Sequence, residues 1–368
     1  MSSDQKPASS KVTRRSFLQT GSAVAAGLAW TAQSYGSILG ANDRIRVGFI
    51  GAGGMANAHM NTYNAIREKN NVEAIAVADC WTTRAEEGKA KTGAKHAFSD
   101  YQKVLDIKDI DYVTIATPEH WHAQMTIDAL DAGKAVYCEK PMTHSIPEAQ
   151  AVIKKQKETK LPIQVGVQGM SDDSYSSAAK AIEEGVLGQV VQAQIEYVRR
   201  YGEQGPWRRP GLKDDEAKPA DLDWNAWLGH APKVDWNPHH YFEWRNYSQY
   251  SGGICTDLFI HRITRIMLYP RRVVGMGGIW QWNDGRNLPD NFEMICEYPR
   301  GMTVYVLGTM SNRVGIDHLI RGYRGTLYFT REGWVAKDKD GKVLAEHKKS
   351  GAEDTKLHHT NLHNHLRN

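Results

Sequence analysis

The strongest constraint on the fold is a glycine-rich turn that joins an expected strand to an expected helix. Residues 44–50 (RIRVGFI) are an apolar segment, and residues 51–56 (GAGGMA) follow it directly. In the order strand, glycines, helix, the pattern G-x-G-x-x-A is typical of a turn that holds a dinucleotide. Gly51 allows the tight turn, Gly53 lets the backbone approach a pyrophosphate, and Ala56 lets the helix pack on the strand. The N-terminus of that helix would then face the phosphate charge.

The rest of the first half repeats a rhythm of strands and helices. We expect strands at 72–78, 111–117, 135–138 and 162–167, and helices at 119–131 and 145–158. Strands that alternate with helices of 10–15 residues predict a parallel, doubly wound sheet. Ligands of such sheets bind at the carboxyl ends of the strands.

Asp79 ends the second expected strand. A carboxylate there can accept hydrogen bonds from both hydroxyls of an adenosine ribose, and it would repel a 2′-phosphate. We therefore expect NAD as the cofactor, with NADP less favoured. Arg84, five residues later, weakens that preference because a guanidinium attracts phosphate.

The second half has a different character. We expect a helix at 174–184, a long strand at 189–201, a loop dense in aromatic residues at 202–250, a helix at 254–269, and strands at 272–282, 291–298, 302–310 and 325–330. Strands joined by short turns predict a mainly antiparallel sheet. The fold class is thus α/β, with an N-terminal Rossmann domain at 41–168 and a C-terminal α+β domain at 169–368.

Residues 1–40 have the pattern of an export signal. Arg14 and Arg15 lie in the segment TRRSFL, which precedes a weakly apolar stretch at 21–32. This stretch is short for a spanning helix. The pattern resembles a twin-arginine signal, so we expect export by the twin-arginine machinery to the periplasm. Cleavage of the signal and its retention as an anchor both stay open.

Charge and cysteine content exclude several classes of function. The formal net charge is +4, and Asp4, Lys6, Lys11, Arg14 and Arg15 account for +3 of it. The nearly neutral remainder argues against binding to nucleic acid. The body of the chain has no apolar run long enough for a transmembrane helix. The four cysteines form no CxxC pair, so we expect buried free thiols rather than zinc or disulfides.

Three motifs together resemble the Gfo/Idh/MocA family, which includes glucose–fructose oxidoreductase and inositol dehydrogenase. They are the GAGGMA turn, residues 138–141 (CEKP) and residues 251–261 (SGGICTDLFIH), and the resemblance covers about residues 43–365. Residues 118–122 (PEHWH) and 223–229 (DWNAWLG) are most similar to exported bacterial members. Such members continue well past a motif like that at 358–361 (HHTN), so we expect this chain to be truncated at its C-terminus.

The resemblance implies a catalytic group of Lys140, Asp257 and His261. Lys140 would lie beside the nicotinamide and the substrate, and His261 would act as the general base with Asp257 and Lys140 assisting. Spacing alone places Asp257 and His261 on one helix face, with Ser251 as the expected cap, but it favours a pair without a catalytic role. The expected cofactor contacts are Gly51, Gly53, Gly54, Met55, Asp79, Thr117, Pro118, His120, His122, Glu139 and Lys140.

Tyr241, Trp244 and Arg245 are the expected substrate residues. Aromatic faces stack on sugar rings, although the same residue types also build cores, and Arg245 suits an anionic or polyhydroxyl substrate. His120 and His122 have helix packing as their alternative role. We expect no metal site, because no carboxylate or thiolate accompanies the histidine cluster His358, His359, His363 and His365.

These expectations favour an exported NAD-dependent oxidoreductase that acts on a hydroxyl of a sugar, a polyol or a sugar derivative. The same residues also suit a redox-neutral, NAD-dependent glycosidase that resembles N-acetylgalactosaminidases. A noncatalytic sugar or nucleotide sensor is the third possibility. We expect a carbohydrate substrate and a homo-oligomer formed through the C-terminal sheet.

Overall fold

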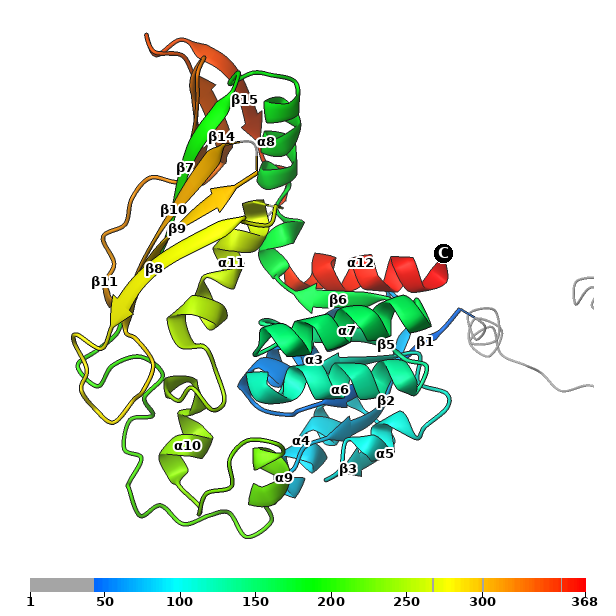
Figure 1. The fold of residues 1–368 in the computed structure, drawn as a ribbon. Helices are drawn as coiled ribbons and strands as arrows, with labels where there is room; N and C mark the ends of the chain where they lie inside the picture. Colours follow the sequence, from blue (N-terminus) through cyan, green and yellow to red (C-terminus); the bar gives the residue numbers. More distant parts are fainter. Residues whose placement is uncertain (1–42, 267, 300, 352) are drawn as a thin grey trace, which may run out of the picture. The chain divides into compact units, whose positions relative to one another are not determined.

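The computed structural model describes residues 43–266, 268–299, 301–351 and 353–368 (Figure 1). The expected export signal lies outside these residues. Among the described residues, no helix combines the length and the apolar character needed to cross a membrane.

The first half is built on a parallel sheet, as expected. Its strands are β1 (Ile45–Ile50), β2 (Val72–Ala78), β3 (His96–Phe98), β4 (Tyr112–Ile115), β5 (Ala135–Glu139) and β6 (Ile163–Gly166). They lie in the order β3-β2-β1-β4-β5-β6, and all neighbours pair in parallel. The strand order reverses between β1 and β4, which is the switch point where doubly wound sheets bind ligands.

Helices cover both faces of this sheet. They are α3 (Gly54–Ile66), α4 (Thr82–Thr92), α5 (Gln102–Leu105), α6 (Glu119–Asp131) and α7 (Ile146–Thr159). Because of this cover, strands such as β1 are buried on both faces, with Val47 and Phe49 in one core cluster and Ile50 in the other. The expected start of α7 is confirmed, since Ser145 and Glu148 form a capping box there.

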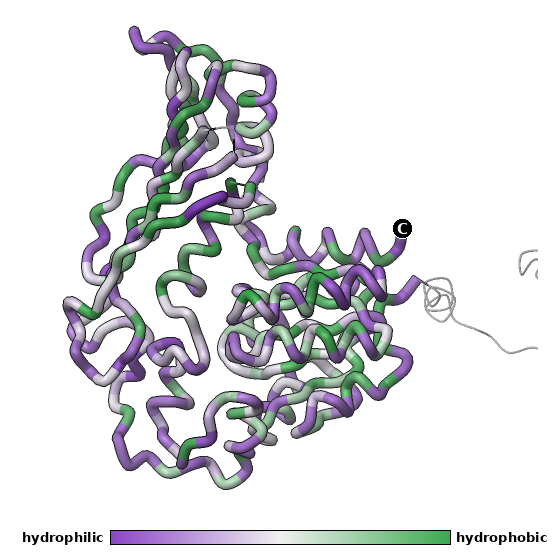
Figure 2. The backbone as a smooth tube through the Cα atoms, viewed as in Figure 1, coloured by the Kyte–Doolittle hydropathy of each residue, from purple (hydrophilic) through white to green (hydrophobic). Residues whose placement is uncertain are grey.

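The second half contains a large, mainly antiparallel sheet, as predicted. Its strands are β7 (Val190–Arg200), β8 (Arg272–Gly278), β9 (Asn291–Tyr298), β10 (Met302–Thr309), β11 (Ser311–Asn312), β12 (Leu319–Gly322), β13 (Thr326–Thr330), β14 (Gly333–Lys337) and β15 (Val343–Lys348). The order is β15-β14-β13-β12-β7-β10-β9-β8, and β11 also pairs with β7. The pair of β7 and β10 is parallel. Figure 2 shows hydrophobic and hydrophilic residues interspersed along these strands, as expected for a sheet buried mainly on one face.

The aromatic loop carries short helices that pack onto the first half. These are α9 (Trp224–Leu228), α10 (Pro238–Phe242) and the 3₁₀ turn η2 (Trp244–Asn246). Trp224, Trp227 and Tyr241 belong to one buried cluster, and Trp81 of the first half packs against it. Asp221 fastens the loop, because its carboxylate accepts hydrogen bonds from Trp81 and from Thr83. Most of the aromatic residues therefore form a core.

The final helix, α12 (Thr355–Arg367), packs against α3 in the first half. Its Leu362 is buried in the same cluster as Val47 and Met60. The expected domain boundary at residue 168 stays a prediction. The helix α12 follows the second sheet in the chain, but it packs against the first half.

Candidate active site

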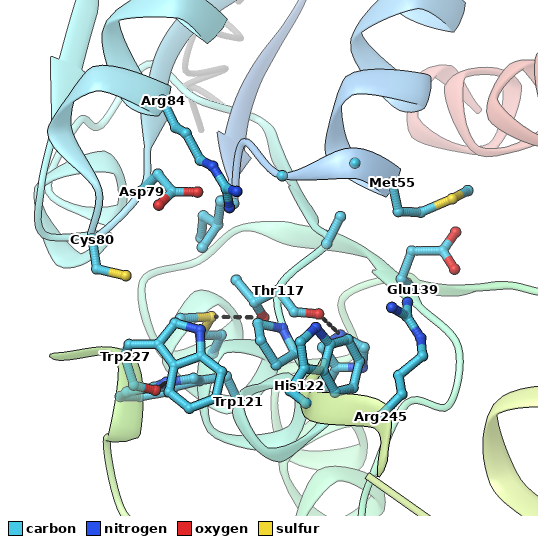
Figure 3. Close-up of a pocket in the computed structure, with 18 of the residues that line it drawn as sticks. Met55, Asp79, Cys80, Arg84, Thr117, Trp121, His122, Glu139, Trp227 and Arg245 are labelled. Atoms are coloured by element: carbon cyan, nitrogen blue, oxygen red, sulfur yellow. Dashed lines mark hydrogen bonds between the residues drawn. The ribbon is translucent and has the colours of Figure 1, made fainter. Parts of the chain in front are cut away.

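A cavity of about 950 Å³ lies between the carboxyl ends of the parallel strands and the second half. Its walls include the glycine turn, the ends of β2, β4 and β5, the aromatic loop, and the segment that follows Gly253. In Figure 3, Asp79, Cys80 and Arg84 lie on one side of this cavity, and Met55, Glu139 and Arg245 lie on the other.

The glycine turn leaves room for an anion. Gly51 has a φ of +94°, and a Cβ there would lie 2.7 Å from the carbonyl oxygen of Ala116, so no other residue fits. A Cβ at Gly54 would meet nothing within 4 Å, and one at Gly53 would meet only Arg84 at 3.6 Å. No side chain caps α3. The N–H groups of its first turn are therefore available to a phosphate.

Asp79 lies at the end of β2, where a ribose is expected. Its two carboxylate oxygens accept hydrogen bonds from the N–H groups of Ala52 (2.8 Å) and Trp81 (2.9 Å). These bonds fix the carboxylate and leave a lone pair on each oxygen for a ribose hydroxyl. The open turn and this acceptor fit a dinucleotide.

Arg84 stands beside this end of the cavity. Its guanidinium lies 4.5 Å from the ring centre of Trp81 and 5.6 Å from that of Tyr241. It also donates a hydrogen bond of 3.2 Å to the Tyr241 hydroxyl. This contact places the Tyr241 hydroxyl near the Asp79 end of the cavity that Tyr241 lines, and its role as a substrate residue stays a prediction.

Lys140 and Asp257 form an ion pair at the other end. Lys140 Nζ lies 2.7 Å from Asp257 Oδ1 and donates a second hydrogen bond, of 3.0 Å, to the Asp257 carbonyl. Arg245 Nε lies 3.3 Å from the same Oδ1. Burial raises the pKa of Asp257, but Lys140 and Arg245 outweigh it and hold that pKa below its usual value. Asp257 is therefore ionised at neutral pH.

His261 lines the same cavity as Lys140 and Asp257. Burial, and secondarily the charge of Lys140, lowers the pKa of His261 to about 4. The imidazole is therefore neutral at pH 7, which is the form that accepts a proton. The structure thus brings the three expected catalytic residues to one cavity, while their catalytic roles stay predictions.

The segment that carries Asp257 and His261 is less regular than expected. It consists of a π-helical turn, η3 (Ile254–Leu258), the short α11 (Ile260–Ile263) and the 3₁₀ turn η4 (Thr264–Ile266). Ser251 does not cap it. The preceding residue is Gly253, which has a φ of +60°, and Ser251 Oγ instead accepts the N–H of Gly253 and donates to Glu119.

Glu119, in the first turn of α6, is a site residue that the sequence analysis missed. Its carboxylate accepts hydrogen bonds from Ser251 Oγ (2.7 Å), Gly252 N (3.1 Å) and Thr256 Oγ1 (3.1 Å). Burial and the charge of Asp257 raise the pKa of Glu119 to about 7. The sequence places Glu119 close to the end of an expected strand. It does not reveal the hydrogen-bond partners of Glu119, because they lie more than 130 residues later in the chain.

His122 and His120 differ in their surroundings. His122 lines the cavity, with Nδ1 2.6 Å from the Pro141 carbonyl oxygen and Nε2 2.8 Å from that of Thr117. It therefore links the ends of β4 and β5. His120 is not among the residues that line the cavity, and the cofactor contact expected of it stays a prediction. It is buried against Trp227, whose carbonyl oxygen lies 3.1 Å from Nε2.

The remaining expected contacts lie on the cavity wall. Gly51, Gly53, Gly54, Met55, Thr117, Pro118, Glu139 and Trp244 all line it. Arg245 stacks on Trp244 at 4.2 Å, so these two expected substrate residues lie beside Asp257. Trp207, from the aromatic loop, also lines the cavity, as do Tyr197 and Arg199, which were not expected.

Three of the four histidines of α12 contact residues of the first half. His358 contacts the Tyr137 hydroxyl, His359 contacts His59, and His363 lies between Asn70 and Tyr112. Within the described ranges, no cluster of three or more potential metal ligands is present.

Comparisons with known proteins agree with this geometry. Residues 45–167 match the family model described as an oxidoreductase family with an NAD-binding Rossmann fold, and residues 172–269 match that family's C-terminal alpha/beta domain. The levoglucosan dehydrogenase of Pseudarthrobacter phenanthrenivorans is 30% identical over 42% of this chain and 41% of its own length. The NAD-dependent scyllo-inositol 2-dehydrogenase of Bacillus subtilis is 31% identical over 40% of this chain and 43% of its own length. The match thus spans about two fifths of each curated relative.

Solved structures show the same fold over most of the chain. A levoglucosan dehydrogenase in complex with NADH and levoglucosan has a TM-score of 0.65 at 20% identity, with 88% of this chain and 89% of that chain covered. The WlbA dehydrogenase of Bordetella pertussis, in complex with NADH and UDP-GlcNAcA, has a TM-score of 0.64 at 19% identity, with 88% of each chain covered. From its two matched domains and its cofactor turn, this chain belongs to the Gfo/Idh/MocA oxidoreductase family, with the NAD-binding Rossmann domain at residues 45–167.

Proposed function

We propose that the protein is an NAD-dependent dehydrogenase that oxidises a hydroxyl group of a sugar, a polyol or a sugar derivative. The observation that carries this proposal is one cavity with two differently equipped ends. The Asp79 end fits the adenosine and pyrophosphate of a dinucleotide. The other end presents an ionised Lys140–Asp257 pair and a neutral His261.

The residues at this second end suit the removal of a hydroxyl proton. A bound nicotinamide would supply the acceptor for the hydride that leaves the same carbon. Neutral His261 takes the hydroxyl proton, and Lys140 donates a hydrogen bond to the hydroxyl oxygen. Asp257 fixes the position of Lys140 through the 2.7 Å ion pair.

The cavity wall also suits a carbohydrate. Trp207, Trp244 and Tyr197 provide aromatic faces, and Arg199 and Arg245 provide hydrogen-bond donors for hydroxyl or carboxylate oxygens. Relatives named as levoglucosan and inositol dehydrogenases support this class of substrate. The carboxylate of Asp79 supports binding of NAD in preference to NADP. Titration of the protein with each cofactor tests this preference.

The test is incubation of the purified protein with NAD and a panel of sugars, polyols and aryl glycosides. A dehydrogenase accumulates NADH, which absorbs at 340 nm, with at least one free sugar or polyol. Cleavage of an aryl glycoside without NADH accumulation would identify a redox-neutral glycosidase instead. If the protein binds NAD and transforms no member of the panel, the proposal of an enzyme acting on this class of substrate fails.

We also propose export and self-association. Arg14 and Arg15 support export to the periplasm by the twin-arginine route.

Exposed apolar side chains support self-association through the second sheet. They are Val274, Met276 and Ile295, which are more than half exposed on the neighbouring strands β8 and β9. Val274 pairs with Ile295, so the three side chains share one face.

A further inference from the structure

Glu139 is a buried carboxylate in the wall of the proposed active site. It ends β5, precedes Lys140, and is 4% exposed. Its Oε1 accepts hydrogen bonds from His59 Nε2 and Gln168 Nε2, both 2.8 Å long. Its Oε2 accepts the N–H of Lys140 at 3.2 Å. Figure 3 shows Glu139 on the same side of the cavity as Met55 and Arg245. Three donors thus hold this carboxylate at the cavity.

A second buried histidine, His359, contacts His59. His59 is completely buried, and its Nδ1 lies 2.9 Å from Nε2 of His359 on α12. Burial lowers the pKa of His359 well below its usual value, so this ring is neutral. His59 donates its Nε2–H to Glu139, so the two nitrogens of His59 connect this carboxylate to His359 on α12.

The hydrogen bonds to Glu139 favour its ionised form. Burial raises the pKa of Glu139, but the hydrogen bond and electrostatic attraction of His59, together with the charge of Lys140, hold it below its usual value. The carboxylate is therefore ionised at neutral pH. Because it is screened from water, its field acts strongly on any charge inside the cavity.

Other charged side chains near Lys140 contribute to the charge balance at this end of the cavity. Lys140 and Arg245 bring two positive charges to Asp257, which offsets one of them. Arg199, stacked on Tyr197, adds a further positive charge to the cavity wall. With an ionised Glu139 these side chains have one more positive than negative charge, and without it they have two more.

The fold places the nicotinamide at this end. The ribose acceptor Asp79 ends β2, and the glycine turn follows β1. A dinucleotide that crosses the switch point therefore extends to the ends of β4 and β5, where Glu139 lies. The oxidised nicotinamide ring carries a positive charge, and the reduced ring carries none.

We propose that Glu139, held by His59 and Gln168, strengthens the binding of the oxidised cofactor relative to that of the reduced one. This inference rests on the proposed function only in that it needs NAD in this cavity. It assigns to Glu139 a role in cofactor specificity, and to His59 and His359 a positioning role at a distance from the substrate.

The test compares the dissociation constants of NAD⁺ and NADH, measured by calorimetry on the purified full chain without substrate. Glu139→Gln removes the charge at nearly constant size, and we expect it to weaken NAD⁺ binding about five- to twentyfold while NADH binding changes less than about twofold. Glu139→Asp keeps the charge and should keep the ratio of the two constants. Glu158→Gln, at a half-exposed position on α7, removes a charge outside the cavity and should change neither constant.

His359→Phe provides a second, independent variant. It retains the stacking on Tyr137, whose ring centre lies 4.2 Å away, but removes the donor to His59. His59, which holds the carboxylate, then loses its own partner, and we expect NAD⁺ binding to weaken more than NADH binding. If circular dichroism shows that Glu139→Gln does not fold, the ratio of the NAD⁺ and NADH dissociation constants in His359→Phe tests the inference instead.

Equal losses of NAD⁺ and NADH affinity would show that Glu139 only supports the structure, and would overturn the inference. An unchanged ratio in a folded Glu139→Gln protein would overturn it as well. If the unaltered protein binds neither cofactor, the proposed function fails first, so the two failures are distinguishable.

Discussion

His261 is the residue whose protonation state decides the proposed chemistry. A general base works in its neutral form, and a lowered pKa extends that form to lower pH. Because the pKa of His261 is lowered from 6.5 to about 4, we expect kcat/KM to show no acid limb from this residue between pH 5 and 6.5. A pH–rate profile of the free enzyme checks this. An acid limb near pH 6.5 that disappears in His261→Asn would show that the imidazole is not desolvated.

Glu119, in the first half, contacts the segment of the second half that carries Asp257 and His261. Its three hydrogen bonds to Ser251, Gly252 and Thr256 fix the start of η3. In Glu119→Ala we expect kcat to fall about 10- to 100-fold, because a small displacement of reacting groups is costly. The dissociation constant of NAD should change less than about twofold.

Glu119→Gln is the matched variant for this prediction. It keeps the size and one acceptor oxygen, so its kcat should lie between those of Glu119→Ala and the unaltered protein. A folded Glu119→Ala protein with normal kcat would show that η3 holds its geometry without the carboxylate.

At the scale of single residues, sequence reasoning found the groups that stand in motifs. Lys140, Asp257 and His261 converge on one cavity because each lies at a strand end or in a marked glycine-rich segment. Glu119 and His59 were missed, since their roles depend on partners brought together only by folding. The contact of Tyr241 with Arg84 could not be predicted for the same reason, because the two residues lie 157 positions apart.

At the scale of elements, α12 offers a direct test of how the last segment is held. Leu362 is 2% exposed in the core of the first half, whereas Leu357 on the same helix is half exposed. Leu362→Ala should lower the free energy of unfolding by about 2–5 kcal/mol, through lost burial and the cavity left behind. Leu357→Ala should change it by less than about 0.5 kcal/mol. Urea denaturation measures both, and equal effects would contradict the packing of α12 described here.

Elements with strong periodicity could be predicted, and irregular ones could not. The expected helix 119–131 and strand 291–298 have the bounds of α6 and β9, because both have clear patterns and marked ends. The segment at 254–269 was expected as one helix, yet it contains the π-helical turn η3. The helix α4 and the strands β3, β12, β14 and β15 are short or weakly patterned, and the sequence analysis did not identify them.

At the scale of the whole molecule, the proposed export has a direct test. A reporter fused to residues 1–45 should leave the cytoplasm, because Arg14 and Arg15 would be recognised by the twin-arginine machinery. Arg14→Lys together with Arg15→Lys should retain the reporter inside the cell, and cell fractionation measures the outcome. Unchanged export of the double variant would assign the protein to another route.

The central claim is that one cavity binds NAD and removes a hydroxyl proton through His261. Its most direct test is to measure NADH formation in a single turnover, and the dissociation constant of NAD, for the unaltered protein and for His261→Ala. The substrate is the sugar or polyol that the panel identifies. We predict that the rate falls about 10²- to 10⁴-fold, the usual contribution of a positioned proton acceptor, while NAD affinity hardly changes. An unchanged rate of NADH formation in His261→Ala would contradict the claim.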